Sequence, residues 1–304
     1  MFSSFFKEFK LNQLFRKCHI HKEKGIPVKE VFQMIFLLAF TGKSFSAFLH
    51  SRNNPFQGKK DTIYRFLQQS RCNWRKFLFL LSTKVVNEAL FPFTTLKRYT
   101  WVVDDSPYER PRSTEVEGLS RFFDHSKGRF SRGFRLLTLG VSDGATFIPF
   151  SFSLLSSHQK ENQLCPMTSI DGRSLRAQIR KESQEKAPEV LLKLLDGALK
   201  HCPLVHTILF DSWFSFPAII RKCSSRGLIV VCMLKNTGKI YYSFGGKPLS
   251  LSSLMTRIQK RPGGNIIGSG VVNLNHTGEP SWLGWSWSEE RTKNLSGWHF
   301  FLPI

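Results

Sequence analysis

The stretch Arg98-Tyr-Thr-Trp-Val-Val-Asp-Asp-Ser-Pro-Tyr-Glu-Arg110 governs the fold and the chemistry expected of this chain. Its residues Tyr99–Val103 are aromatic and β-branched, which predicts a β-strand. The strand then meets Asp104 and Asp105, and we expect Pro107 to stop its regular continuation. Two carboxylates at the end of an apolar strand repel each other and are poorly solvated unless a metal ion or a base neutralises them.

A second stretch, His206-Thr-Ile-Leu-Phe-Asp-Ser-Trp-Phe214, repeats this pattern. An apolar run again ends in an aspartate, Asp211, which lies 107 residues after Asp104 and is followed by a small polar residue. Two such strand ends indicate one divalent-metal site. For Asp211 alone, a helix N-cap is the alternative, because a helix is expected soon after it.

The composition favours a polyanionic partner. The chain has 304 residues, enough for one large domain or two modest ones, and 41% of them are hydrophobic. Its formal charge of +22 comes from 44 Lys and Arg against 22 Asp and Glu. Such an excess argues against an ordinary metabolic enzyme and favours nucleic acid first and an anionic membrane second.

Targeting signals and paired cysteines are not evident. The best apolar run, Val31–Phe40, is shorter than the roughly 18 residues that cross a bilayer, and the N-terminus does not have the order of a signal peptide. The six cysteines show no C-x2-C pair, so reduced thiols are expected rather than zinc. We expect a cytoplasmic bacterial protein that is associated with the nucleoid when bound to DNA.

Residues 1–97 are predicted to form a basic helical DNA-binding region. Residues 1–98 carry 18 Lys and Arg against 5 Asp and Glu, more than half of the net charge. Helices are expected over Lys29–Phe40, from Asp61 as N-cap, and over Trp74–Leu90. Short basic helices are typical of DNA-binding domains, and a helical cap with a solvated basic face is the alternative.

Residues 98–235 are predicted to form the first part of an α/β core. Arg135–Ser142 and Thr146–Leu155 flank Asp143-Gly144, a hairpin signal, which makes Asp143 a turn residue. Pro188–Leu199 is an amphipathic helix. The order strand, hairpin, helix, strand, helix, strand is that of a ribonuclease-H-like domain, whose first and fourth strands lie side by side. Residues 236–280 contain short strand-like pieces and predict a β-rich insertion.

The segment Tyr108–Gly133, which follows the first strand, is polar and basic. We expect Arg110, Arg112, Arg129 and Arg132 to hold a phosphodiester backbone beside the carboxylates. A solvated surface loop is the alternative for each of these arginines.

Three segments carry a resemblance to a known family. Val102–Pro111, Gly133–Gly144 and Leu209–Ser215 resemble the corresponding motifs of transposases of the insertion sequence 4 group, which belong to the Asp-Asp-Glu class. The resemblance extends over about residues 25–275. It implies that the first catalytic aspartate is Asp104, with Asp105 as the alternative, and that the second is Asp211.

The resemblance also implies the reaction. Asp104 and Asp211 would be catalytic metal ligands for strand cleavage and transfer at insertion-sequence ends, the chemistry of DNA transposition and recombination. Two Mg²⁺ or Mn²⁺ ions about 4 Å apart would activate a water or a DNA 3′-hydroxyl, since carboxylate oxygens suit these metals and not zinc. The implied partner is double-stranded DNA, at terminal inverted repeats and target sites, bound by a homodimer.

The family's third carboxylate lies in a helical Y-x(2)-R-x(3)-E-x(6)-K signature that has no match here. Glu279, Glu289 and Glu290 stand in another context. Residues 281–304 resemble an aberrant, out-of-frame tail, because the codons for Gly297–Phe301 encode an apolar strand in a shifted frame. We expect a C-terminally truncated or frameshifted, defective copy. The alternatives are a non-catalytic DNA-binding truncated transposase that occupies element ends and, less favoured, an RNA-directed nuclease.

Overall fold

The computed structural model describes residues 2–42, 44–51, 54, 56–92, 99–257, 266–274, 280–287 and 298–302. The chain forms two compact units. One comprises Met1–Pro92 with Ser169–Ile179, and the other comprises Phe93–Thr168 with Arg180–Ile304. The predicted junction between residues 97 and 98 lies outside the described residues. No helix in the described part of the chain is long and apolar enough to span a membrane.

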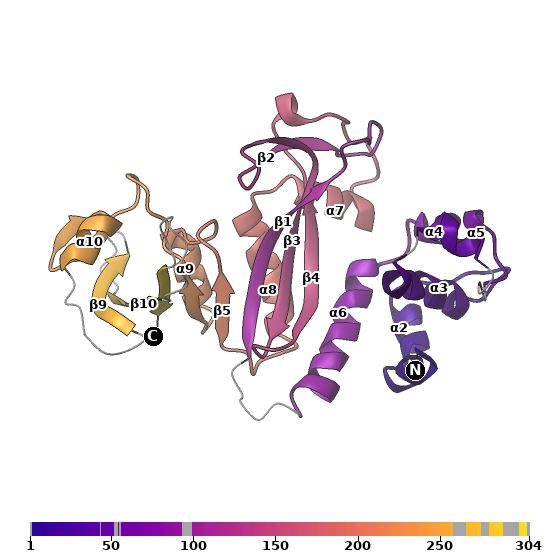
Figure 1. Ribbon diagram of the computed structural model, residues 1–304, viewed down its shortest axis with the longest axis horizontal. Coiled ribbons are helices and arrows are strands. Elements are labelled where there is room, and N and C mark those ends of the chain that lie inside the picture. The colour runs from indigo at the N-terminus through magenta and orange to yellow at the C-terminus, as the bar shows by residue number, and fades with distance from the viewer. Residues whose placement is uncertain are drawn as a thin grey trace. The chain divides into compact units, whose positions relative to one another are not determined.

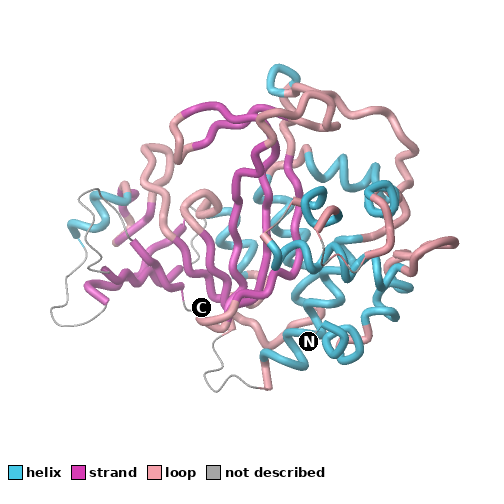
Figure 2. Tube along the Cα trace, turned by 45° about the vertical axis from the view of Figure 1, so that its right-hand side comes forward, coloured by secondary structure: helices cyan, strands magenta, loops and turns pink. Residues whose placement is uncertain are grey.

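Residues 2–92 of the first unit are mainly helical (Figures 1 and 2). The helices pack around a core that is rich in phenylalanine. The ring of Phe32 lies 5.1 Å from that of Phe15 and 5.3 Å from that of Phe77. Ser44 and Asn73 cap two of the helices by accepting hydrogen bonds from backbone N–H groups. The helices are α1 (Phe2–Glu8), α2 (Leu11–Lys17), α3 (Val28–Thr41), α4 (Phe45–Leu49), α5 (Lys60–Leu67) and α6 (Trp74–Val85), with a π-helical turn at Val86–Leu90.

The helices predicted in this region are confirmed, but one of them begins at a different residue from the one predicted. Helix α3 covers the expected Lys29–Phe40, and α6 with its π-helical turn covers Trp74–Leu90. Asp61 is not an N-cap, because α5 begins one residue earlier and its N-cap is Lys59. Asp61 instead lies in the first turn, where a negative charge also stabilises a helix.

The second unit is organised around a mixed β-sheet. The strand order is β2-β3-β1-β5-β6-β11-β10-β9-β7-β8. Strand β4 lies off this order and pairs with β3. The first strands are β1 (Thr100–Glu109), β2 (Ser120–Asp124), β3 (Arg129–Ser142), β4 (Phe147–Leu155), β5 (Thr207–Phe210) and β6 (Ile229–Cys232). Strand β3 is antiparallel to β1 and β4, whereas β5 is parallel to β1 and β6. This mixed α/β arrangement fits the predicted ribonuclease-H-like class.

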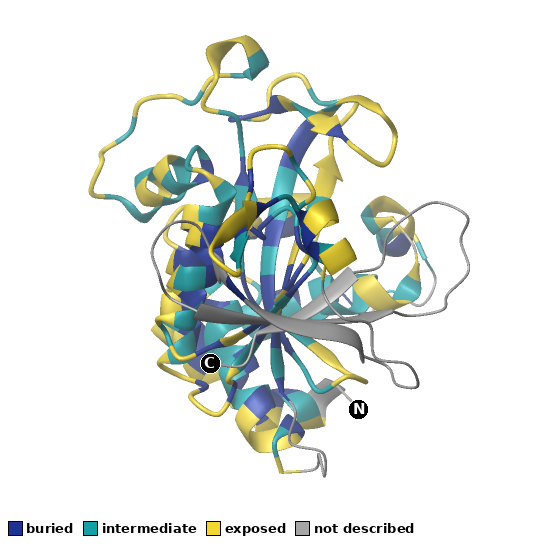
Figure 3. Ribbon diagram, turned by 90° about the vertical axis from the view of Figure 1, so that its left-hand side faces the viewer, coloured by how far each residue is buried: buried dark blue, intermediate teal, exposed yellow. Residues whose placement is uncertain are grey.

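One face of the central strands is packed under helices. Trp101 of β1, Ile208 of β5 and Val230 of β6 are fully buried. Helix α8 (Ala187–Leu199) packs on β3 and β4, and α9 (Pro217–Ser224) packs on β6. Buried residues gather along these strands, whereas the loops at the edge of the sheet are largely exposed (Figure 3). Because side chains alternate between the two faces, this packing decides which strand residues are available to a site.

The first strand is longer than the sequence predicts. Strand β1 continues through Asp104, Asp105 and Pro107 to Glu109, because β3 pairs with it as far as Gly133. The prediction that Pro107 stops the strand is therefore wrong. Pairing with β5 ends at Val102, so the missing N–H of the proline costs no hydrogen bond on that side.

Two polar segments also contain regular structure. The segment Tyr108–Gly133 is largely a β2–β3 hairpin, because Ser120 pairs with Gly133 and Asp124 pairs with Arg129. The segment 155–186 holds a 3₁₀ turn at Lys160–Asn162 and helix α7 (Leu175–Ser183). Short polar strands and helices of this kind lack the apolar period by which elements are detected.

The C-terminal elements extend the sheet. They are β7 (Tyr242–Phe244), β8 (Lys247–Leu249), α10 (Leu251–Arg257), β9 (Ile266–Leu274), β10 (Pro280–Trp287) and β11 (Trp298–Leu302). The described parts of residues 236–280 contain β7, β8, β9 and helix α10. The segment that we expected to be aberrant contains β10 and β11, and β11 pairs with β6.

Candidate carboxylate site at the ends of two parallel strands

Asp104 lies on β1, and Asp211 directly follows the last residue of the neighbouring strand β5. Thr100 of β1 pairs with Thr207 of β5, and Val102 pairs with Leu209, so that paired positions differ by 107 residues. The same offset separates Asp104 from Asp211. Neighbouring strands lie about 4.8 Å apart. The fold therefore brings the two predicted aspartates to the same edge of the β1–β5 pair.

Asp104 and Asp211 are both exposed. The carboxylate of Asp104 accepts a hydrogen bond from the Ser106 hydroxyl. Oδ1 of Asp211 accepts a hydrogen bond from the backbone N–H of Trp213 at 2.9 Å. Asp211 is not a helix N-cap, because α9 begins at Pro217 with Phe216 as its N-cap. Both carboxylates are thus held by short local contacts and are open to solvent.

Asp105 belongs to the opposite, packed face of the sheet. It follows Trp101 and Val103 in the buried row of β1, and its side chain is only 4% exposed. Its Oδ1 accepts a hydrogen bond from Nε of Arg135 at 3.1 Å. Its Oδ2 lies 2.6 Å from Nη2 of Arg135 but lacks a hydrogen bond of good geometry. Asp105 is therefore neutralised by an arginine, unlike its neighbour.

The negative charges of Asp104 and Asp211 act on the buried carboxyl of Asp105. Burial raises the pKa of the Asp105 carboxyl to about 6, Arg135 opposes this rise, and the negative charges of Asp104 and Asp211 add to it. A carboxylate whose charge is disfavoured by like charges nearby is a feature of sites that bind cations or transfer protons.

The donor chemistry of this edge fits a hard divalent cation. Asp104 and Asp211 offer exposed carboxylate oxygens, which Mg²⁺ and Mn²⁺ prefer as ligands. Within the part of the chain that the structure describes, no group of three or more His, Cys, Asp or Glu side chains converges on one position. The third-carboxylate candidates Glu279, Glu289 and Glu290 lie outside the described residues. Of the carboxylates expected at this site, the structure describes Asp104 and Asp211.

The four predicted DNA-contacting arginines are all exposed. Arg110 and Arg132 are brought together, because the N–H of Arg110 donates to the carbonyl of Arg132 at 2.8 Å. Arg129 lies at the start of β3, at the turn of the β2–β3 hairpin, and Arg112 lies in the loop after β1. The guanidinium of Arg110 also lies over the Tyr108 ring. The outer end of β1 therefore presents a basic surface beyond the carboxylates.

Two residues near the carboxylates were not predicted as site residues. Arg135 shares the buried row of β3 with Leu137 and Leu139. An arginine in such a row requires a carboxylate partner, and that signal was available in the sequence. Trp213 is only partly buried, and the guanidinium of Arg135 lies 4.6 Å from its ring centroid.

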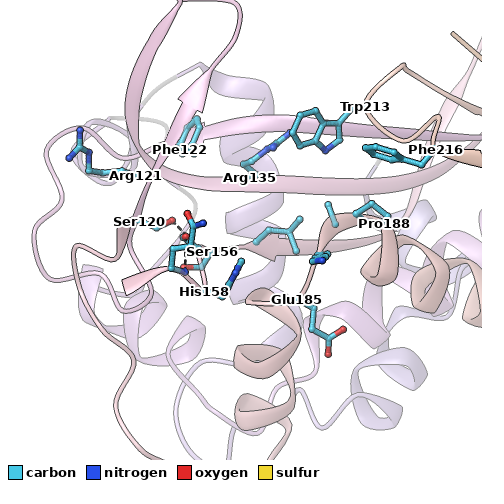
Figure 4. Close-up of a pocket in the computed structure, with 15 residues that line it drawn as sticks. Ser120, Arg121, Phe122, Arg135, Ser156, His158, Glu185, Pro188, Trp213 and Phe216 are labelled. Carbon is cyan, nitrogen blue, oxygen red and sulfur yellow. Dashed lines mark hydrogen bonds between the residues drawn. The ribbon is translucent and has the colours of Figure 1, made fainter. Parts of the chain in front are cut away.

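A cavity of about 550 Å³ opens beside these two residues (Figure 4). Its lining comes from β2, β3, the segment after β4, the start of α8 and the segment after β5. Arg121, His158 and Phe216 line it together with Arg135 and Trp213. The cavity is within the size range of ligand sites, and it lies on the Asp105 side of the sheet.

One of the comparisons with known proteins found a match. A family model described as DDE superfamily endonuclease matches residues 36–247, more than two thirds of the 304 residues. The match includes β1, β5 and all three aspartates. A comparison with curated proteins returned no match.

Proposed function

The chain belongs to the DDE superfamily of endonucleases, and we propose that it is a transposase that cuts and joins DNA strands at the ends of an insertion sequence. The observation that supports this proposal is the register of the parallel strands β1 and β5, because Asp104 and Asp211 each lie two residues past the last pair, Val102 with Leu209. Membership of the family accounts for a nuclease that acts on DNA, and the formal charge of +22 agrees with such a polyanionic substrate.

In this proposal Asp104 and Asp211 hold Mg²⁺ or Mn²⁺ through their carboxylate oxygens. The bound metal supplies the Lewis acidity that makes a water or a DNA 3′-hydroxyl nucleophilic and stabilises the leaving oxygen. Both carboxylates are exposed and so can be reached by a DNA strand. The Ser106 hydroxyl and the Trp213 N–H each orient one of the carboxylates by a hydrogen bond.

The basic residues position the DNA in this proposal. Arg110, Arg112, Arg129 and Arg132 are exposed beyond the carboxylate edge and would contact backbone phosphates. The basic helices of residues 1–97 would contribute sequence-independent or specific DNA binding, which the excess of 18 basic over 5 acidic residues in the first 98 supports. The terminal inverted repeats, a homodimer on DNA and a cytoplasmic, nucleoid-associated location belong to the same proposal.

A second function is favoured by one observation. No third carboxylate joins Asp104 and Asp211 among the residues that the structure describes. A defective copy would bind element ends without cutting them, as a non-catalytic DNA-binding protein.

One assay separates the two functions. A labelled duplex that carries the terminal inverted repeat is incubated with the protein in Mg²⁺, in Mn²⁺ and in EDTA. Metal-dependent nicking supports the transposase, and salt-sensitive binding without nicking supports the non-catalytic protein. A protein that neither binds nor nicks the duplex would contradict both.

A further inference from the structure

Arg135 is anchored on both sides of its guanidinium. On one side it contacts both carboxylate oxygens of Asp105, at 3.1 Å from Nε and 2.6 Å from Nη2. On the other side it lies over the ring of Trp213, 4.6 Å from the centroid. Its side chain is 28% exposed, so these contacts are partly shielded from water. A planar guanidinium that is both paired and stacked has a fixed orientation.

Trp213 connects this arginine to the second strand. Its backbone N–H donates to Oδ1 of Asp211 at 2.9 Å, and its ring covers Arg135. The ammonium group of Lys235 lies 4.9 Å from the same ring centroid, and the ring of His125 also contacts it. The indole is therefore held from several directions, and Figure 4 shows it beside Arg135 at the cavity.

The contacts form one continuous path between the strand ends. It runs from Asp105 on β1 to Arg135 on β3, then to the Trp213 ring, and through the Trp213 N–H to Asp211 after β5. Backbone pairing between β1 and β5 ends at Val102 and Leu209, before either aspartate is reached. Beyond that point this path supplies side-chain contacts that link the two ends.

We propose that Arg135 and Trp213 are a pair of positioning residues that fixes the carboxylate edge of β1 relative to that of β5. The proposal rests on the proposed function in so far as it concerns metal binding. In this proposal, neither Arg135 nor Trp213 contacts the reacting atoms. Their effect is to hold Asp211 and the Asp104–Asp105 segment at one separation, which a shared metal site requires.

The test compares Mn²⁺ binding by intact variants, followed by the electron paramagnetic resonance of free Mn²⁺. Arg135→Gln and Trp213→Leu should weaken binding by about 10- to 100-fold, as loss of supporting contacts does at metal sites. Trp213→Phe keeps a ring under the guanidinium and should restore most of the affinity. Arg135→Lys should not restore the affinity, because an ammonium group cannot pair with both carboxylate oxygens and stack on the ring at once.

Arg226→Gln is the matched control. Arg226 is 25% exposed and pairs with both oxygens of Asp196, at 2.6 and 3.0 Å, away from the strand ends. Its loss removes a comparable ion pair and should leave Mn²⁺ affinity unchanged. Equal weakening by Arg226→Gln would show a general loss of stability and overturn the positioning role, as would unchanged Mn²⁺ affinity in folded Arg135→Gln and Trp213→Leu.

A metal-free measurement separates this inference from the proposed function. Melting temperatures are compared for Asp105→Asn, Trp213→Leu and the double variant. In the path, Asp105 and Trp213 are linked only through Arg135. If the path acts as a unit, the melting-temperature shift of the double variant should differ from the sum of the two single shifts. Additive melting-temperature shifts would contradict the proposal that Arg135 and Trp213 act as a pair. A wild-type protein that binds no Mn²⁺ contradicts the proposed function, and the thermal comparison then decides the positioning pair alone.

Discussion

Asp104 and Asp211 lie level at the edge of the β1–β5 pair, with the 107-residue offset that also relates Thr100 to Thr207. The placement follows from the parallel register of β1 and β5, whose last pair, Val102 with Leu209, lies two residues before each aspartate. Strand β5 stops at Phe210 and leaves Asp211 in a turn, whereas β1 runs on along β3. The two aspartates are therefore neighbours with different backbone conformations, because Asp104 lies in an extended strand and Asp211 lies in a loop.

DNA affinity should fall steeply with salt, and each of Arg110, Arg112, Arg129 and Arg132 should contribute to that dependence. Replacement of one arginine by glutamine should lower the slope of log affinity against log salt by about 0.9 if it contacts one phosphate. Fluorescence anisotropy of a labelled duplex at several salt concentrations measures the slope. Arg226→Gln, whose arginine pairs with Asp196, should leave it unchanged.

Unchanged slopes for all four variants would contradict the assignment of this surface to DNA. A decrease shared by the Arg226 control would point to a general effect of net charge rather than to contacts at the hairpin.

Gly133→Ala should destabilise the protein by about 2 kcal/mol or more. Gly133 has φ of +148°, and a Cβ there would collide with the carbonyl oxygen of Tyr108 and approach the N atom of Arg110. The outer end of β1 must then move. Thermal unfolding measures the cost, and DNA affinity should fall as well because Arg110 is displaced.

Gly144→Ala provides the comparison for this prediction. Gly144 also has a positive φ, of +98°, but a Cβ there meets nothing within 4 Å. Its replacement should cost only the backbone strain, about 1 kcal/mol. Equal losses for the two variants would show that the contact with Tyr108 is unimportant.

The elements that the sequence predicted well are the buried ones. The apolar runs of β5 and β6 and the amphipathic face of α8 have strong periods, so their positions follow from local pattern. The Asp143 turn was equally clear, and its carboxylate accepts hydrogen bonds from the N–H groups of Ala145 and Thr146. Resemblance and spacing together then placed Asp104 and Asp211 at one edge.

The elements that were missed depend on partners distant in sequence. Strand β1 continues past Pro107 because β3 pairs with it, which no local pattern of β1 reveals. The cap predicted at Asp61 was wrong, because the N-cap of α5 is Lys59, two residues earlier. The cap alternative for Asp211 does not hold either, because the N-cap of α9 is Phe216, five residues later. Arg135 and Trp213 were overlooked since their role appears only when three segments meet.

Glu117→Gln should destabilise the protein at neutral pH by about 1–2 kcal/mol. Glu117 accepts hydrogen bonds from the N–H and hydroxyl of Thr168, both at 2.7 Å, and pairs with Arg180. Thr168 and Arg180 flank residues 169–179, where the chain leaves this unit and returns. The glutamine keeps the size of the side chain but loses its charge.

The same variant should show a defined pH dependence. Burial acts to raise the pKa of Glu117, but the contacts with Thr168 and Arg180 outweigh it and hold the pKa below its ordinary 4.5. A lowered pKa stabilises the fold above the ordinary value, and this stability is lost as pH falls through the lowered pKa. The difference in melting temperature between wild type and Glu117→Gln should therefore shrink below about pH 4.5. A difference that grows on acidification would contradict this assignment.

The metal site itself can be tested by calorimetric titration of Mn²⁺ into the wild type and into Asp104→Asn, Asp105→Asn, Asp211→Asn and Asp143→Asn. Asp143 is the matched control, because it is a partly exposed aspartate at the turn of the β3–β4 hairpin. The account predicts that Asp104→Asn and Asp211→Asn each weaken Mn²⁺ binding by about tenfold or more, while Asp143→Asn binds like the wild type. Wild-type affinity in Asp104→Asn or Asp211→Asn, with loss in Asp105→Asn instead, would contradict it.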